Sequence, residues 1–259
     1  MYGDALLLEM VTDQDLSFAL EATGVPPSRL PVILSTVRED PSIQDALLDD
    51  ERVFAALTAD PQVFMRVSPY LLFSVLLHRA RRELAHRTYT AEWLGPRRRV
   101  PVFDAHQVAE ALADEERVRY LAELLSSFTR VHSVPRGGQG RLRAQRRFHE
   151  LNLRDLRRLR AQVTGQDRFA LDRRLGDVAL LLAGVFPDSA QAVTDMDAWE
   201  QEAARGYARA AEDPLAERLG LDRILERLAG DPRTTRKALN FVVDRFLQPL
   251  RASWFRLGA

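Results

Sequence analysis

The sequence of 259 residues contains no cysteine and only one lysine, Lys237. The absence of cysteine excludes disulfide frameworks, thiol catalysis, and zinc or iron–sulfur sites that use cysteine ligands. Long apolar runs are also lacking, because the strongest, Val178 to Phe186, has nine residues, about half of what a bilayer requires. The chain starts Met-Tyr-Gly-Asp, without the basic and apolar stretches of a secretory signal. We therefore expect a cytoplasmic, bacterial-type protein without membrane association.

The sequence motifs of several common enzyme classes are missing as well. We find no Walker pattern, no Gly-x-Gly-x-x-Gly, no Gly-x-Ser-x-Gly and no His-Glu-x-x-His. The sequence therefore favours a protein that is not an enzyme, and we expect neither a cofactor nor a bound metal. The sequence alone assigns the chain to no family.

The charged residues are balanced in number but unevenly distributed. Arginine supplies 36 of the 37 basic residues, against 37 acidic residues. Residues 1–61 carry twelve acids and three bases, whereas residues 130–174 carry thirteen bases and four acids. We expect these two regions either to attract each other within the fold or to present surfaces of opposite sign.

Helix signals dominate the chain. Asp-Pro is typical of a helix start, because aspartate accepts hydrogen bonds from the first turn and proline already has a helical φ. The pair occurs four times, at 40–41, 60–61, 213–214 and 231–232. Further helices are predicted over 69–87, from Asp104 and again from Asp114 toward Ser127, and over 153–163, 168–186, 197–212, 215–229 and 232–257, with a kink at Pro249.

The predicted core is centred on Tyr70–Leu77, Val178–Phe186 and Leu239–Leu247, with Phe241 and Phe246 facing inward. Gly176 and Gly184 lie inside the predicted helix 168–186, where each costs about 1 kcal/mol relative to alanine. Two such glycines indicate that another helix passes close by.

Two segments are predicted to be β-hairpins, one over 88–103 and one over 129–148. They could pair into a small antiparallel sheet, although residues 141–148 could equally begin a helix. No long linker divides the chain. We therefore predict a mainly α protein, a single domain over 1–259, in which roughly nine to eleven helices form an orthogonal array or bundle with β-hairpins near the middle.

The basic residues of the two predicted hairpins give the strongest functional lead. A planar guanidinium suits carboxylate and phosphate groups. The candidate residues for binding an anion or a partner are Arg97, Arg98, Arg99, Arg136, Arg141, Arg143, Arg146 and Arg147, with Arg154, Arg157, Arg158 and Arg160 on the helix that follows.

Four other polar residues are candidates for catalysis or for metal binding. His78 directly follows an apolar run and Asp177 directly precedes one, so both are predicted to be buried. An Asp–His pair could serve acid–base chemistry or simply hold two helices in register. Glu83 and His86 form a single Glu-x-x-His unit, with Arg79 placed to pair with Glu83.

Three hypotheses of function follow from these observations. The first is a non-catalytic interaction or regulatory protein whose arginine-rich element docks an acidic protein partner. The second is binding of DNA or RNA backbones through the same element, although a net charge of zero and few interleaved aromatics weigh against it. The third is a small-molecule or metal-dependent enzyme that uses His78, Glu83, His86 or Asp177.

Overall fold

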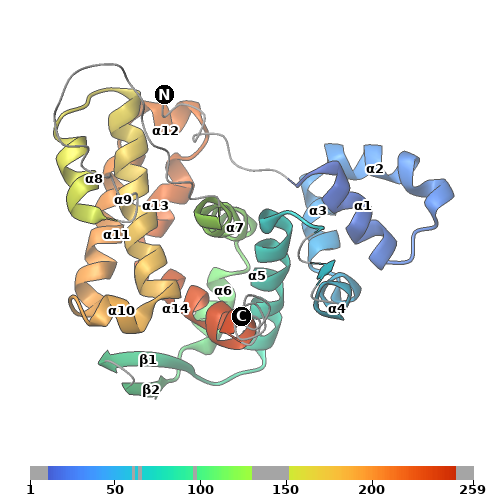
Figure 1. Ribbon diagram of the computed structural model, residues 1–259, viewed down its shortest axis with the longest axis horizontal. Coiled ribbons are helices and arrows are strands. Elements are labelled where there is room, and N and C mark those ends of the chain that lie inside the picture. Colours follow the sequence, from blue (N-terminus) through green and yellow to red (C-terminus); the bar gives the residue numbers. More distant parts are fainter. Residues whose placement is uncertain (1–10, 60–61, 64–65, 96–97, 130–151, 249–259) are drawn as a thin grey trace.

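The computed structural model describes residues 11–59, 62–63, 66–95, 98–129 and 152–248. Over these residues the protein is mainly α, with one two-stranded antiparallel hairpin in the middle of the chain (Figure 1). The N-terminal helices are α1 (Asp13–Ala22), α2 (Leu30–Glu39), α3 (Pro41–Leu48) and α4 (Glu51–Ala59). After α5 (Pro69–Ala85) come β1 (Thr90–Gly95), β2 (Arg98–Val102), α6 (Ala105–Ala111) and α7 (Glu115–Thr129). The second half contains α8 (Leu153–Arg160), α9 (Gln166–Val185), α10 (Pro187–Gln191), α11 (Met196–Ala211), α12 (Pro214–Arg218), α13 (Asp222–Gly230), α14 (Pro232–Val242) and a π-turn over Val243–Leu247.

Aspartate and proline start helices as the sequence predicts. Asp40, Asp213 and Asp231 each accept a hydrogen bond from a backbone N–H in the first turn of α3, α12 and α14, and proline is the first residue of each helix. The fourth pair, 60–61, lies outside the described residues. The sequence signal for helix starts is therefore confirmed at the three positions that the structure describes.

Helix α5 connects the N-terminal helices to the remainder of the protein. Leu71 and Val75 pack among the apolar side chains of α1–α4, whereas Leu72 and Leu76 pack in the larger core formed with α6, α7, α9, α11, α13 and α14. Figure 1 shows α5 between α1–α4 on the right and the other helices on the left. The predicted burial of the whole segment Tyr70–Leu77 is confirmed, because the helix is covered on opposite sides.

The two glycines of α9 mark close helix contacts, as the sequence predicts. A Cβ atom on Gly176 would lie 2.8 Å from the ring of Tyr207 in α11, and one on Gly184 would lie 2.7 Å from Cβ of Leu239 in α14. Gly206 of α11 faces Gly176 directly at the first contact. The crossing of α9 and α11 therefore depends on the absence of side chains on both helices.

Several sequence predictions need correction. The residues that the structure describes form 14 helices, more than expected, because short helices such as α10 and α12 carry too little periodic pattern to be counted. The segment predicted as one helix over 215–229 is two, broken at Gly220, whose φ of 66° is the left-handed conformation that favours glycine. Phe186 is 39% exposed rather than in the core, whereas Phe246 is buried and Phe241 packs partly against the core.

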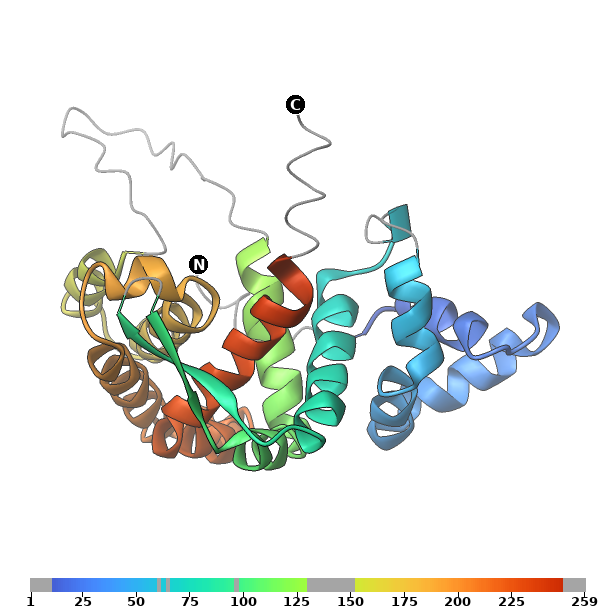
Figure 2. The same ribbon diagram turned by 90° about the horizontal axis from the view of Figure 1, so that it is seen from below.

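The first predicted hairpin is confirmed, and its strands cross α14 (Figure 2). Thr90 pairs with Val102 and Trp93 with Arg99, with an irregularity before Gly95. The second predicted hairpin, 129–148, begins at the end of α7 with Thr129, and the rest of it lies outside the described residues. None of the helices that the structure describes is long and apolar enough to cross a membrane.

Candidate functional site

The β-hairpin is fixed to the helices by two buried side chains of β1. Trp93 is buried in the main core. The carboxylate of Glu92, also buried, accepts hydrogen bonds from Arg236 at 2.6 Å and from Arg233 at 3.1 Å, and lies 3.2 Å from the ammonium group of Lys237. These ion pairs hold β1 against α14 and lower the pKa of Glu92, although its burial opposes the shift. The hairpin is therefore held in place by buried contacts with the helices.

The outer side of the hairpin exposes apolar side chains. Side chains alternate along a strand, so Arg99 and Pro101 lie on the same side of β2, and Phe103 follows directly after the strand ends at Val102. Phe103 is 81% exposed, and its ring meets that of Tyr89 edge-on, with centroids 6.5 Å apart. We call Tyr89, Arg99, Pro101 and Phe103 the hairpin face. Leu94, 57% exposed, and Arg98 lie at the tip of the hairpin.

The arginines of the hairpin differ in how they are bound. Arg99 stacks over the ring of Trp93, with its guanidinium carbon 3.9 Å from the centroid, and forms an ion pair of 2.5 Å with Asp244. Arg98 is exposed and forms no ion pair with any residue in the described part of the chain. Arg97 lies outside that part. The guanidinium of Arg98, which has no ion-pair partner among the described residues, therefore lies next to that of Arg99, which is paired with Asp244.

The second group of candidate arginines is described only in part. Arg136, Arg141, Arg143, Arg146 and Arg147 lie outside the described residues. On α8, which follows them, Arg157 and Arg160 form ion pairs with Glu202 of α11 and Asp172 of α9. Arg158 lies 3.9 Å from Asp155 of its own helix, and Arg154 is exposed. Carboxylates of the same protein therefore satisfy much of the positive charge on α8.

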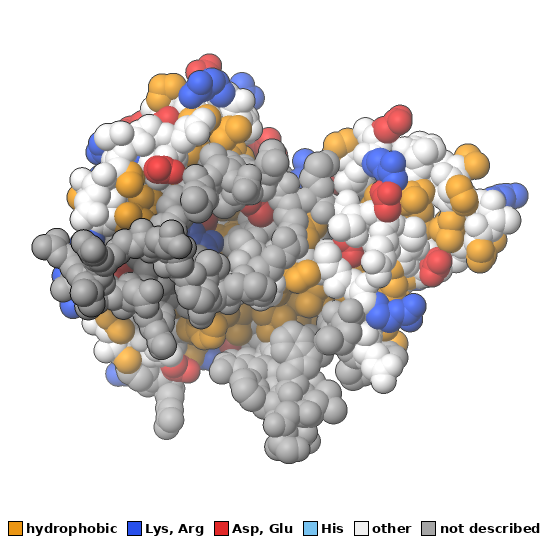
Figure 3. Space-filling view, turned by 45° about the horizontal axis from the view of Figure 1, so that its top comes forward, with side chains coloured by type: hydrophobic (Ala, Val, Ile, Leu, Met, Phe, Trp, Pro, Cys, Tyr) orange, Lys and Arg blue, Asp and Glu red, His pale blue; other side chains and the backbone are white. Residues whose placement is uncertain are grey.

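The described arginines do not converge on one surface. Helix α8 and the hairpin lie at opposite ends of the body in Figure 1. In the described part of the face shown in Figure 3, acidic and basic side chains are scattered singly among apolar and neutral ones. Binding to a phosphate backbone requires a broad positively charged surface. The arginines of 98–99 and 154–160 do not form one.

Among the described residues, acidic side chains of the N-terminal region pair with arginines of α5 and α7, while residues 130–151 of the basic segment lie outside the described part of the chain. Asp49 binds both Arg81 and Arg82 at 2.8 Å, and Glu51 binds Arg79 at 2.8 Å. Asp45 binds Arg119. These ion pairs attach α3 and α4 to α5 and α7, and the expected attraction between residues 1–61 and 130–174 stays a prediction.

His78 is buried where α3, α5 and α7 meet. Its exposed fraction is 1%, and burial lowers the pKa of the imidazole to about 4, so the ring is neutral at pH 7. Its Nε2 atom lies 3.8 Å from Oε2 of Glu115. One candidate oxygen of Asp45, one nitrogen of His78 and one oxygen of Glu115 all lie within 4.8 Å of one another. The sequence predicted the burial of His78 but neither carboxylate beside it.

Asp177 is buried at the crossing of α7, α9 and α11. Its Oδ1 atom accepts hydrogen bonds from the hydroxyls of Tyr120 at 2.8 Å and Tyr207 at 3.0 Å. Arg173, one turn earlier on α9, lies 3.9 Å from the other oxygen and donates to Glu123 at 2.7 Å. Burial raises the pKa of both tyrosines well above the usual value and also raises the pKa of Glu123.

His78 and Asp177 therefore belong to two separate polar clusters with different partners. The hypothesis of an Asp–His pair finds no contact in the described structure to support it. The Asp177 cluster ties three helices together, but through two tyrosines and Arg173 and not through a histidine.

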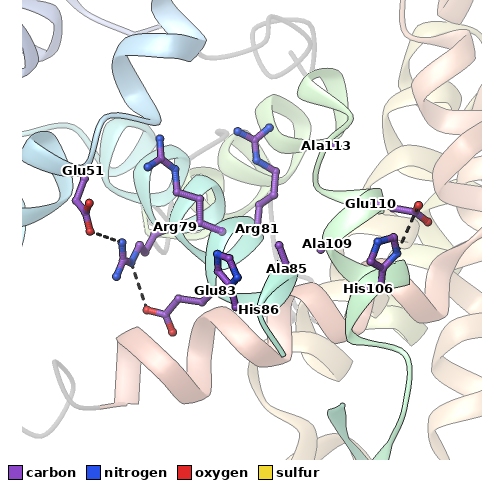
Figure 4. Close-up of a pocket in the computed structure, with 11 residues that line it drawn as sticks. Glu51, Arg79, Arg81, Glu83, Ala85, His86, His106, Ala109, Glu110 and Ala113 are labelled. Carbon is purple, nitrogen blue, oxygen red and sulfur yellow. Dashed lines mark hydrogen bonds and ion pairs between the residues drawn. The ribbon is translucent and has the colours of Figure 1, made fainter. Parts of the chain in front are cut away.

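Glu83 and His86 line a polar pocket of about 760 Å³ at the ends of α5 and α6 (Figure 4). Glu83 is bound by Arg79 at 3.3 Å and by Arg245 at 2.7 Å, as the salt-bridge interpretation predicts for Arg79. His106 of α6 also lines the pocket and lies 3.5 Å from Glu110. Neither His78 nor Asp177 contributes to this lining, so the four candidate catalytic residues are distributed over three places.

The chain was also compared with known proteins. It matches no protein-family model, no curated protein and no solved structure.

Proposed function

We propose that the protein is a non-catalytic interaction protein that docks an acidic partner protein through the hairpin face and the hairpin tip. The observation that carries the proposal is the outer side of the hairpin, where Phe103 is 81% exposed beside Tyr89 and where Arg98 has no ion-pair partner among the described residues. Aromatic residues and arginine are enriched in the centres of protein interfaces, where truncation of one such residue often costs more than 1 kcal/mol.

The anchoring of the hairpin supports this function. A surface held by a buried tryptophan and by the ion pairs of Glu92 loses little conformational freedom when a partner binds. Proline at position 101 removes a backbone donor from β2, so side chains rather than strand pairing are expected to carry the recognition.

The chemistry of the partner follows from the charge of the hairpin. The stretch 93–103 contains three arginines and no acidic residue. A partner with carboxylates beside an apolar surface complements both the guanidinium groups and the exposed rings. Nucleic acid is the second candidate partner that the sequence suggests, and the experiment below distinguishes it from an acidic protein.

The test measures binding of two fluorescent probes, a glutamate-rich peptide of about twenty residues that contains leucine and a duplex DNA of similar charge, at low and moderate salt. The full chain should bind the peptide, and Arg98→Glu and Phe103→Ser should each weaken it by about tenfold, which corresponds to about 1.4 kcal/mol. Arg218→Glu is the matched control, because Arg218 is exposed on α12, away from the hairpin.

The outcomes separate the hypotheses. Equal loss with Arg218→Glu, or no peptide binding at low salt, would refute docking through the hairpin. Stronger binding of the DNA, with an affinity that falls steeply as salt rises, would favour the nucleic-acid hypothesis instead.

A further inference from the structure

The buried cluster around His78 contains polar atoms that the protein itself leaves without partners. Nδ1 of His78 and Oε2 of Glu115 are both buried, and neither forms a hydrogen bond within the described structure. A buried polar group without a hydrogen bond costs about 1–3 kcal/mol. Oε2 of Glu115 also lies 3.8 Å from Nε2 of His78, and a cation bound between these two atoms would give this oxygen the partner that it lacks.

The three side chains come from three different helices and include the donor types that bind metal ions. Asp45 lies on α3, His78 on α5, and Glu115 is the first residue of α7. Nε2 of His78 and Oε2 of Glu115 are 3.8 Å apart, and the three candidate ligand atoms lie within 4.8 Å of one another. Ligands around a tetrahedral zinc ion at about 2.0–2.2 Å are roughly 3.3 Å apart, so small side-chain rotations would close the set.

The surrounding charges leave one position open for a cation. Arg119 donates to both carboxylate oxygens of Asp45, so an ion must displace one of these hydrogen bonds. Arg81 donates to Oε1 of Glu115 at 3.0 Å, whereas Oε2 of Glu115 has no hydrogen-bond partner among the described residues. Arg82 faces the cluster as well, but Asp49 binds both Arg81 and Arg82.

We propose that Asp45, His78 and Glu115 bind a divalent transition-metal ion of the zinc type, which joins α3 to α5 and α7. Imidazole combined with carboxylates suits zinc and its neighbours in the first transition row, whereas magnesium and calcium prefer oxygen ligands alone. The fourth position is left to water. The ion holds the N-terminal helices on the remaining helices, and this role does not depend on the proposed docking through the hairpin.

The test is a zinc titration of the full chain after removal of metal with a chelator, followed by calorimetry and thermal unfolding. One equivalent should bind, and at about a hundredfold excess over Kd the Tm should rise by about 5–10 °C. His78→Leu and Glu115→Gln should each weaken binding at least tenfold. Arg119→Gln should tighten binding, because it removes a guanidinium that competes for Asp45.

Exposed histidines provide the control. His86→Ala and His106→Ala change imidazoles in the pocket of Figure 4 and should leave the affinity unchanged. Cobalt bound to the wild-type chain should show the intense visible absorption of a four-coordinate ion, a readout that does not depend on the folding of His78→Leu, and the weak absorption of a six-coordinate ion would overturn the proposed site. Zinc binding that survives His78→Leu, or that is lost with His86→Ala or His106→Ala, would overturn the proposal. A titration without saturable binding of one zinc ion per chain would also overturn it.

Discussion

The crossing of α9 and α11 gives a prediction whose sign and size follow from the structure. A Cβ atom added to Gly206 would lie 2.5 Å from the backbone nitrogen of Gly176, 2.8 Å from its Cα and 2.9 Å from the carbonyl oxygen of Asp172. All three atoms belong to the backbone, so no side-chain rotation relieves the contact. Gly206→Ala therefore requires the two helices to separate.

The expected loss of stability combines two opposing effects. Overpacking in a core costs about 1–3 kcal/mol, and a backbone contact belongs at the upper end of that range. Alanine in place of glycine inside a helix recovers about 1 kcal/mol. The net loss for Gly206→Ala is therefore about 2 kcal/mol, which lowers the Tm of a protein of this size by about 4–8 °C.

Thermal unfolding followed by circular dichroism tests this, with Gly230→Ala as the matched control. Gly230 is the last residue of α13, and a Cβ atom there would meet no other atom within 4 Å. The same exchange at Gly230 should leave Tm unchanged or raise it by up to about 3 °C. If Gly206→Ala leaves Tm unchanged or raises it, the close contact of α9 with α11 is refuted.

Two further predictions concern the buried polar clusters. In metal-free buffer, His78→Leu should reduce the loss of stability in acid, since the folded pKa of about 4 lies below the ordinary value of 6.5 and only the unfolded chain binds the proton between these values. In urea unfolding, the free energy of unfolding of the wild type should fall by about 2–3 kcal/mol more than that of the variant between pH 7 and pH 4.5. An equal fall in both proteins would contradict the low pKa of His78. Asp177→Ala should cost about 3–5 kcal/mol, because it removes the acceptor of two buried tyrosine hydroxyls, whereas Asp177→Asn, which keeps an acceptor, should cost less. Equal urea midpoints for the two variants would show that the tyrosine hydroxyls do not need a hydrogen-bond acceptor at position 177.

Local sequence signals predicted much of the fold because they act over one or two helical turns. Asp40, Asp213 and Asp231 accept from amides two or three residues ahead, so the helix starts could be read from the sequence. The β-formers of Thr90–Gly95 predicted the hairpin in the same way. Where the pattern was short or interrupted, as at α12 and Gly220, the prediction joined two helices into one.

The sequence also determined which residues are buried, because an apolar run that covers all sides of a helix must be enclosed. Tyr70–Leu77 and His78 are buried as predicted. The sequence likewise predicted the close approach of other helices at Gly176 and Gly184, because glycine is unfavourable inside a helix and occurs twice in this one.

Only the tertiary structure decided which charges meet. An arginine side chain is long enough to reach a carboxylate on another helix, and sequence separation does not limit that choice. Arg99 thus pairs with Asp244, and Asp45 and Glu115 come to lie beside His78 from helices that are distant along the chain. The functional candidates changed for this reason: the packing of the helices paired several arginines of α8 with internal carboxylates and left Arg98 without an ion-pair partner among the described residues. It also brought together three side chains of metal-ligand type that no spacing in the sequence had indicated.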